Sequence, residues 1–549
     1  MAIDGIYLLN WCSAKSYEWV SDSSERADKT FTTLITDMGQ FYTITVYFNV
    51  KKHHTHKVEF LDSLKIFPNF SVDKVAKGFN LPIRKLKIDY HAKREIGHQL
   101  TQEEIDYIRN DVEIMARALN YMFSEGHNKM TIASDAMSNF KEHFTGFRKK
   151  FPLLDNELDK ELRRSYKGGF TYVNEKWKEK QVGKGIILDV NSLYPSVLVQ
   201  CPMPYGNPIY YEGKYQEDTS YPLFIQVLSC SFEIKPGKIP SIQLKNNLSF
   251  VPTEYVKSSK GQVVTLYLTS VDLKLFLSQY KTFHLSYQYG WKFKSSMGLF
   301  DNYVNHWTEQ KIKAGKEGNA PLRQLSKLML NSIYGRFSLS PIARQKAPYL
   351  DEDGVIHFMM LPPETRESVY LPVGSFVTSW GRFKTITTSQ AIKDFTLKKY
   401  GEDRYYYSDT DSIHASLTEE DLEELKDIVQ IDDYKLGYWA KEAEFTKAIY
   451  IRSKSYIEEI DGKVHVTVAG LPKYLAPLIT FDNFKRGFST EGLDLIEIRK
   501  IAKENGASEE EIEKIQHKLT YKYVKGGVIL ADTDFTIKWK TTPERGSRS

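Results

Sequence analysis

The sequence places acidic side chains where apolar strands are expected to end. The run Gly185–Val190 reads Gly-Ile-Ile-Leu-Asp-Val, which predicts a buried strand interrupted by Asp189. Two more carboxylates, Asp409 and Asp411, lie at the bend between short strands expected over 404–408 and 412–415. A buried carboxylate is costly unless it is paired or bound to a cation, so these positions restrict the folds open to the chain.

Each of these carboxylates also has a common structural explanation. A single aspartate often ends a strand in a turn, and an isolated Asp-x-Asp often forms an Asx turn. Together, however, Asp189 and the Asp409/Asp411 pair offer hard oxygen ligands that suit two Mg²⁺ ions about 3.5–4 Å apart, the arrangement for in-line phosphoryl transfer.

A basic helical stretch over 303–337 carries a polar stripe. Four side chains fall on one helix face, namely Arg323, Lys327, Asn331 and Tyr334. Two cations, an amide and a phenol make a poor core face, and they suit a triphosphate and a base. A solvated basic stripe explains the same pattern equally well.

Two features upstream are weaker. The segment 163–184 holds seven basic and two acidic residues, and its Gly168-Gly169 pair predicts a backbone that closely approaches something, such as a phosphate chain. A solvated linker is the usual explanation for such a charge run. The stretch 101–123 predicts a helix that begins with a Thr101/Glu104 capping box, and Tyr107 and Asp111 share one of its faces.

Composition excludes several classes of protein. A length of 549 residues predicts about 3.7 domains. No apolar run approaches the ~18 residues that span a bilayer, and three widely spaced cysteines exclude a disulfide framework and a four-cysteine zinc site. The net charge of +5 is small beside 75 basic and 70 acidic residues, so total charge does not identify a partner.

Three motifs, in this order, resemble motifs A, B and C of the family B DNA polymerases. They are Asp-x-x-Ser-Leu-Tyr-Pro at 189–195, Lys-x-x-x-Asn-Ser-x-Tyr-Gly at 327–335 and Tyr-x-Asp-Thr-Asp-Ser at 407–412. Tyr-x-Gly-Gly at 166–169 and Lys-x-Tyr at 454–456 are similar to the linker motif and the primer-contacting motif of that family. Inserts over 202–300 and 341–372 are similar to the two inserted regions of its protein-primed, phi29-type phage subgroup. The resemblance runs from about Asp4 to Lys538.

The resemblance implies a role for each matching residue. It makes Asp189, Asp409, Asp411 and the Val190 carbonyl the ligands of two Mg²⁺ ions, which Mn²⁺ can replace. It assigns the incoming nucleotide to Tyr194, Lys311, Lys327, Asn331 and Tyr334, with Lys313 as an alternative to Lys311. Tyr194 would also reject a 2′-hydroxyl. It assigns the contacts with DNA to Tyr166, Gly168, Gly169, Lys454 and Tyr456.

The implied fold is a multidomain α+β right-hand polymerase with a ferredoxin-like palm, helical fingers and a small thumb. The expected parts are an RNase H-like 3′–5′ exonuclease domain over 1–145, linker and palm start over 146–201, a first insert over 202–300, fingers over 301–340, a second insert over 341–372, palm over 373–469, thumb with a helical insert over 470–540 and a vector-like tail over 541–549.

The exonuclease domain departs from the family pattern. The third carboxylate motif is present as Tyr107-x-x-x-Asp111, and Lys85 resembles a strand-binding position of that domain. The second motif survives only as Asp4 in Ile-Asp-Gly, and the first, Asp-x-Glu, would precede it. Two carboxylates do not easily hold two metals, so the sequence predicts an N-terminally truncated domain whose exonuclease is absent or crippled.

The implied activity is DNA-templated addition of dNTPs to a 3′-hydroxyl, protein-primed, processive and strand-displacing, in the cytoplasm of a bacterial host. The partners would be primer-template and single-stranded DNA, dNTPs and a terminal protein, with a monomeric enzyme and no membrane. The alternative is a non-catalytic DNA-binding replication factor on a polymerase scaffold.

Overall fold

The computed structural model describes residues 2–51, 54–68, 70–88, 98–352, 355–367, 369–469, 473–485, 500, 503–504, 518–524 and 527–533. Two units make up the chain, and each combines stretches that are distant in the sequence. The first unit contains Met1–Lys149, Phe300–Val369 and Thr520–Ala531. The second contains Lys150–Leu299, Tyr370–Leu519 and Asp532–Ser549. Most of the predicted helical insert of the thumb and the whole tail fall outside the described residues.

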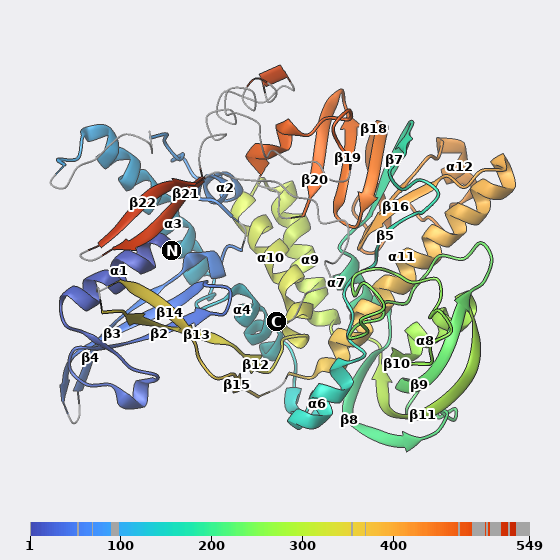
Figure 1. Ribbon diagram of the computed structural model, residues 1–549, viewed down its shortest axis with the longest axis horizontal. Coiled ribbons are helices and arrows are strands. Elements are labelled where there is room, and N and C mark those ends of the chain that lie inside the picture. Colours follow the sequence, from blue (N-terminus) through green and yellow to red (C-terminus); the bar gives the residue numbers. More distant parts are fainter. Residues whose placement is uncertain are drawn as a thin grey trace. The chain divides into compact units, whose positions relative to one another are not determined.

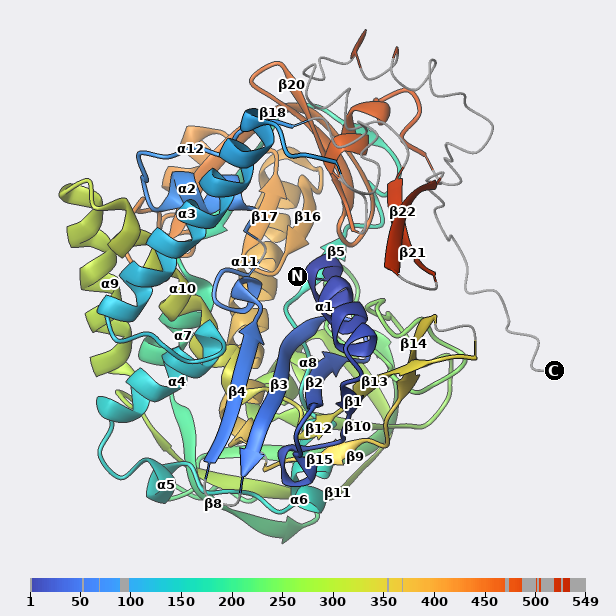
Figure 2. The ribbon, with the colours of Figure 1, turned by 90° about the vertical axis from the view of Figure 1, so that its left-hand side faces the viewer.

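A mixed sheet organises the first unit, with strand order β14-β13-β2-β3-β4 and β1 paired to β2 (Figure 2). Its strands are β1 (Glu18–Trp19), β2 (Thr30–Thr36), β3 (Phe41–Lys51), β4 (His54–Leu61), β13 (Gln345–Leu350) and β14 (Ile356–Met360). The second predicted insert therefore supplies two strands to the sheet of the N-terminal domain. Ile356 also joins the apolar core that helix α1 (Ala2–Ala14) forms on this sheet.

Helices fill the rest of the first unit. They are α2 (Val72–Gly78), α3 (Gln102–Ser124), α4 (Ile132–Glu142), α5 (Phe147–Lys150), α9 (Asp301–Lys316) and α10 (Ala320–Phe337), with the short pair β12 (Ile342–Ala343) and β15 (Glu364–Thr365). The predicted capping box of α3 is present, since Thr101 and Glu104 each bond the other's backbone N–H. Phe140 of α4 stacks on Phe300 with ring centroids 4.9 Å apart, so α4 and the base of α9 share one aromatic core. The described part of the unit also includes the hairpin β21 (Lys518–Val524) and β22 (Gly527–Thr533).

The second unit is built on a largely antiparallel sheet with strand order β20-β19-β18-β7-β17-β16-β5, and β6 pairs with β18 (Figure 1). Its strands are β5 (Thr171–Val173), β6 (Gln181–Val182), β7 (Gly185–Val190), β16 (Tyr405–Asp409), β17 (Ser412–Ala415), β18 (Trp439–Arg452), β19 (Ser455–Ile460) and β20 (Lys463–Val468). The predicted buried strand is β7, and the predicted hairpin is β16–β17. Helices α6 (Asn156–Arg163), α7 (Leu193–Gln200), α11 (Leu371–Tyr400) and α12 (Glu419–Glu424) complete this part.

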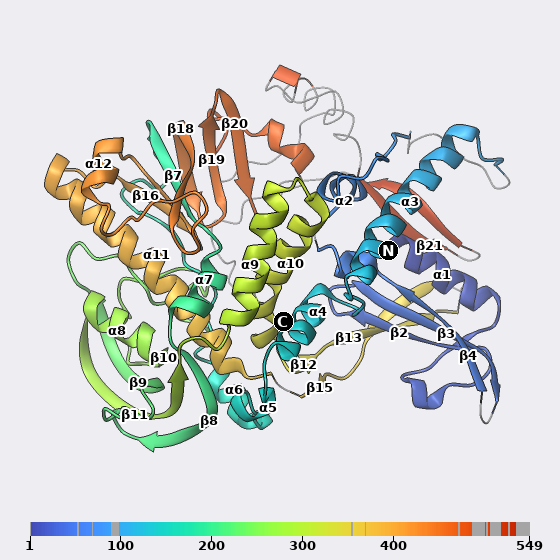
Figure 3. The same ribbon diagram turned by 180° about the vertical axis from the view of Figure 1, so that it is seen from behind.

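The first predicted insert forms a separate module within the second unit. It is a sheet of order β10-β9-β11-β8 with helix α8, and its core is apolar. The bounds are β8 (Met203–Glu212), β9 (Leu223–Ile234), β10 (Val264–Thr269), α8 (Ser270–Gln279) and β11 (Tyr280–Ser296). Figure 3 shows α11 running between this module and the larger sheet, and it contacts α7, α8 and β16. Among the described residues, no helix has the length and apolarity that a membrane crossing requires.

Candidate active site

Strand register brings the predicted carboxylates of the second unit together. In the antiparallel pairs, Asp189 of β7 lies opposite Ser412 of β17, and Ser412 lies opposite Asp409 of β16. Side chains at directly opposed positions share one face of a sheet, so these three form a row. Asp411 joins them at the bend, where its carbonyl accepts the Val190 N–H at 2.9 Å and its own N–H donates to the Asp409 carbonyl at 2.7 Å.

The turns that carry this site have unusual backbone conformations. Ser192 and Thr410, in the first and third predicted motifs, and Lys454, in the Lys-x-Tyr motif, have φ of 53°, 63° and 55°. Residues other than glycine seldom adopt such positive φ, and residues that do so cluster at functional sites. Two bonds hold the Thr410 peptide in place: its N–H donates to the Phe170 carbonyl at 2.6 Å, and its carbonyl accepts the Thr385 hydroxyl at 2.7 Å.

The close approach predicted for the Gly-Gly pair is to protein. A methyl group on Gly169 would lie 2.7 Å from the Thr410 side chain, whereas one on Gly168 would meet no atom within 4 Å. Gly169 therefore lets the linker pack directly against the bend that bears Asp409 and Asp411. A phosphate contact is not needed to explain this glycine.

Burial and nearby like charges raise the pKa of two of the carboxylates. Burial, then the neighbouring Asp411 and Glu442, raise the pKa of Asp189 to about 7. Burial is also the largest cause that raises the pKa of Asp411 above its ordinary value. Asp409 is instead paired, since its Oδ1 lies 2.8 Å from Lys454 Nζ and its Oδ2 accepts the Tyr407 hydroxyl at 3.3 Å.

This donor set fits a hard divalent cation in its chemistry. Asp189 and Asp411 offer carboxylate oxygens, and a cation beside them would favour the charged forms that burial and like charges disfavour. As placed, no three His, Cys, Asp or Glu side chains of the described residues converge into a completed metal cluster.

The predicted primer-contacting residues lie beside this row. The Lys454 N–H donates to the Tyr407 hydroxyl at 2.9 Å, and the Tyr456 ring lies 5.0 Å from the Tyr407 ring. Half of the Lys454 side chain is exposed, so its ammonium group can meet a ligand as well as Asp409. Tyr194, on α7, is half-buried against Gly381 of α11.

Sequence reasoning missed a buried arginine that supports the linker. Arg382 of α11 is 1% exposed and donates to the carbonyls of Lys167 and Gly168, each at 2.7 Å. Its other end pairs with Asp272 of the first insert at 2.7 Å. Burial lowers the pKa of the Lys167 ammonium to about 8. Nothing local in the sequence marks Arg382, because its partners are about 110 and 215 residues away.

In the first unit, three of the four residues of the predicted polar stripe are exposed, and Tyr334 is half-buried. Arg323, Lys327 and Asn331 are exposed, whereas Leu325 and Ile333 on the same helix are buried. Lys311 of α9 joins this cluster: burial, then repulsion by Lys327 and Arg323, lowers its pKa. Three cations held close together favour an anionic ligand.

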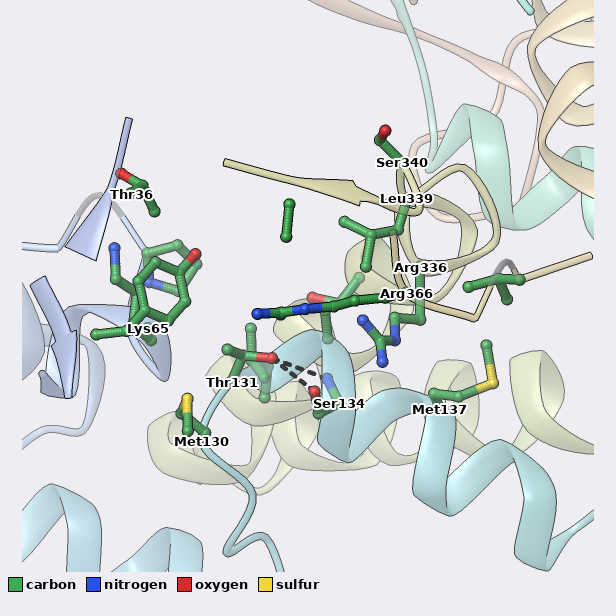
Figure 4. A pocket seen from close by; sticks show the side chains of 18 of the residues that line it. Thr36, Lys65, Met130, Thr131, Ser134, Met137, Arg336, Leu339, Ser340 and Arg366 are labelled. Carbon is green, nitrogen blue, oxygen red and sulfur yellow. Dashed lines mark hydrogen bonds between the residues drawn. The ribbon is translucent and has the colours of Figure 1, made fainter. Parts of the chain in front are cut away.

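A large cleft of about 1440 Å³ opens beside the predicted nucleotide residues Asn331 and Tyr334 of this unit (Figure 4). Its basic lining consists of Lys65, Lys141, Arg148, Arg336, Arg344 and Arg366, against the acidic residues Asp37 and Glu367. Burial is the largest cause that lowers the pKa of Lys141, and Arg148 and Arg336 add repulsion. Tyr42 lies against Lys65, whose Nζ is 4.1 Å from the ring centroid. Cations interleaved with an aromatic ring are typical of a cleft that binds single-stranded nucleic acid.

Some of the residues predicted for a residual exonuclease site are in contact with one another. Lys85 Nζ lies 2.6 Å from the Tyr107 hydroxyl and 2.5 Å from Asp111 Oδ2. The Asp111 carboxylate is thus neutralised by a lysine of its own domain. The side chain of Asp4 lies outside the described residues.

Comparisons with known proteins agree with this geometry. The family model described as DNA polymerase type B, organellar and viral, matches residues 93–430. The chain is 42% identical to the DNA polymerase of Bacillus phage B103 and 41% identical to that of Bacillus phage phi29, over 98% of this chain and 90% and 89% of theirs. Phi29 DNA polymerase in complex with primer-template DNA and incoming nucleotide superposes with a TM-score of 0.85 and 38% identity, over 98% of this chain and 90% of that one.

Proposed function

Because the chain belongs to the type B DNA polymerases of organelles and viruses and is a DNA-directed DNA polymerase of the phi29 type, we propose that Asp189 and Asp411 bind the divalent cations for nucleotide addition. The observation that carries this proposal is the strand register, which places Asp189 beside the bend of Asp411, where burial, with like charges nearby, raises the pKa of both carboxylates. Asp409 and the Val190 carbonyl complete the proposed set. Mg²⁺, or Mn²⁺ in its place, would supply charge neutralisation at the reacting phosphate and acidify the attacking hydroxyl.

The chain's own residues then hold the two substrates. Lys454 and Tyr456 bind the primer end, and Tyr166, Gly168 and Gly169 contact the DNA strand. Solved relatives were observed with primer-template DNA, with incoming nucleotide and with single-stranded DNA, which supports the same ligands here. We assign a single template strand to the basic cleft of the first unit.

The incoming nucleotide falls to five residues of the predicted set. Lys311, Lys327 and Asn331 receive its triphosphate, because the crowding of cations around Lys311 is relieved by an anion. Tyr334 packs on the nascent base pair. Tyr194 lies under the sugar and excludes a 2′-hydroxyl.

A primer-extension assay tests the metal ligands. Asp189→Asn and Asp411→Asn should each abolish extension in Mg²⁺, whereas Asp427→Asn, at an exposed aspartate of the same unit, should extend normally. Full extension by Asp411→Asn would refute the assignment.

For the start of synthesis, we propose protein priming. The module over 202–300 and the β13–β14 hairpin correspond to the two inserts that suggested it. An assay without a DNA primer, containing a candidate terminal protein, Mg²⁺ or Mn²⁺ and labelled dATP, should label that protein. Labelling only when a DNA primer is present would refute protein priming. The setting proposed for this reaction is a monomeric enzyme that replicates a phage or similar linear genome in the bacterial cytoplasm.

We also propose that proofreading is absent or crippled. The sequence supports this proposal, because Asp4 and Asp111 are the carboxylates matched to that site, and two carboxylates do not easily hold two metals. Degradation of 3′-labelled single-stranded DNA that Asp111→Ala abolishes would refute it.

A further inference from the structure

A buried histidine and a buried glutamate lie behind the row of carboxylates. His414 of β17 is 2% exposed and Glu458 of β19 is 3% exposed. His414 Nδ1 and Glu458 Oε1 are 2.6 Å apart, and the Tyr450 hydroxyl donates to the same oxygen at 2.7 Å. A carboxylate has no proton to give, so Nδ1 of the ring is the donor of this bond.

The other ring nitrogen faces the active site. His414 Nε2 lies 3.3 Å from Ser412 Oγ, and that hydroxyl lies 3.4 Å from the Asp409 carbonyl. Because Ser412 pairs with Asp189 on one side and with Asp409 on the other, its side chain stands between the two carboxylates on one sheet face. With Nδ1 as the donor to Glu458, Nε2 is left to accept the Ser412 hydroxyl, so Glu458, His414 and Ser412 form a hydrogen-bonded relay that ends at Ser412, between Asp189 and Asp409.

Stability alone does not account for this arrangement. Replacing a buried pair of polar groups by apolar residues of similar volume is often neutral or stabilising, so such pairs give weak evidence for a stabilising role. Apolar side chains could replace the polar pair here, since His414 lies opposite Ile187 and Tyr407 in the same sheet. In metal sites, by contrast, hydrogen-bonded groups behind the ligands orient them and tune their affinity.

We propose that Glu458 and His414 are positioning residues that fix the Ser412 hydroxyl between Asp189 and Asp409 and thereby set the affinity of the carboxylate row for divalent cations. The proposal rests on the metal-binding function proposed above. It adds His414 and Glu458, which lie outside the predicted motif residues, to the machinery of nucleotide addition. The carboxylates bind the cations, and the relay orients the carboxylate row.

Two variants and one matched control test the relay. Ser412→Ala removes the hydroxyl at the end of the relay. His414→Phe removes the imidazole at the centre of the relay and keeps a ring of similar size. The control is Tyr405→Phe, because Tyr405 is equally buried in β16 and its hydroxyl bonds Ser408 Oγ at 3.0 Å, away from the relay. Ser408 precedes Asp409, so that bond lies on the opposite face of the strand.

Binding of Mn²⁺ to the DNA-free protein, measured by electron paramagnetic resonance, is the primary readout. Ser412→Ala and His414→Phe should each weaken Mn²⁺ binding about tenfold, the lower end of effects seen for groups behind metal ligands. The Mg²⁺ concentration for half-maximal primer extension should rise in parallel, with the dNTP KM unchanged. Tyr405→Phe should bind Mn²⁺ like the parent protein.

The outcomes distinguish the relay proposal from the metal-binding proposal on which it rests. If the parent protein binds no Mn²⁺ and extends primers without a divalent cation, the metal-binding function itself is wrong. If the parent binds Mn²⁺ and Ser412→Ala binds it equally well, the relay is wrong, whether or not His414→Phe folds. A double variant no weaker than His414→Phe alone would support a single relay, and additive losses would refute it.

Discussion

Metal-free stability should depend on pH through Asp189. Its pKa is about 7 in the fold, against an ordinary value of 3.8, because burial and the nearby Asp411 and Glu442 disfavour the charged form. The folded protein then holds a proton that the unfolded chain has lost between these two pH values. Stability contributed by this group is therefore fully present below about pH 3.8 and is lost as pH rises through about pH 7.

The size of the effect follows from the same shift. From pH 5 to pH 8, about two pH units fall in the range where the folded protein holds this proton and the unfolded chain does not. Two pH units correspond to a loss of about 2.7 kcal/mol in the free energy of unfolding, before any reduction by screening. The Asp189 side chain is partly exposed, and screening by water reduces the expected loss to about 1–2 kcal/mol. Asp189→Asn cannot titrate, so it should lack this component while keeping every other pH dependence of the chain.

Urea unfolding in EDTA at pH 5 and pH 8 provides the measurement. The free energy of unfolding should fall from pH 5 to pH 8 by about 1–2 kcal/mol more in the parent protein than in Asp189→Asn. Added Mg²⁺ at pH 8 should restore stability to the parent protein alone, because a cation removes the repulsion that raised the pKa. An equal pH dependence in both proteins would show that Asp189 is not crowded, and the electrostatic basis of the proposed metal site would fail.

Three further predictions concern packing and binding. Gly169→Ala should reduce primer extension and cost about 1–3 kcal/mol in urea unfolding, because the new methyl group meets Thr410, whereas Gly168→Ala, whose methyl group meets no atom within 4 Å, should unfold like the parent protein. Phe140→Ala should lower the free energy of unfolding by about 3–5 kcal/mol through loss of the aromatic core beneath α9, and a change below about 1 kcal/mol would contradict that packing. Lys311→Ala should raise the dNTP KM in steady-state extension about tenfold, since one charge-assisted phosphate contact is lost, and an unchanged KM would exclude the contact.

Local pattern predicted the elements that carry the site. The apolar run of β7 could be read directly, because a strand buried on both faces shows as a continuous apolar stretch. The hairpin β16–β17 and the capping box of α3 were equally visible, since each depends on residues within a few positions of one another. The exposed stripe of α10 followed from helical spacing alone.

What the sequence could not predict depends on contacts between distant segments. The second insert over 341–372 was expected as a separate part between fingers and palm, yet Gln345 pairs with Thr36 and so extends the N-terminal sheet. No periodicity within 341–372 encodes that partner, because a strand edge pairs through its backbone and carries little sequence signature. The same holds for Arg382, which links the linker to the first insert through one side chain.

Gly169 shows that a close approach predicted from residue type needs the fold to identify its partner. Its residue type indicated a close approach, and a basic neighbourhood suggested a phosphate as the approaching group. The structure places the Thr410 side chain against this glycine, and Thr410 itself has a φ of 63°. The glycine and the strained threonine are therefore best understood together: the missing side chain of one makes room for the bend of the other. A bend packed against the linker in this way cannot relax to an ordinary turn without displacing Asp409 and Asp411, which explains why strain can persist at this position.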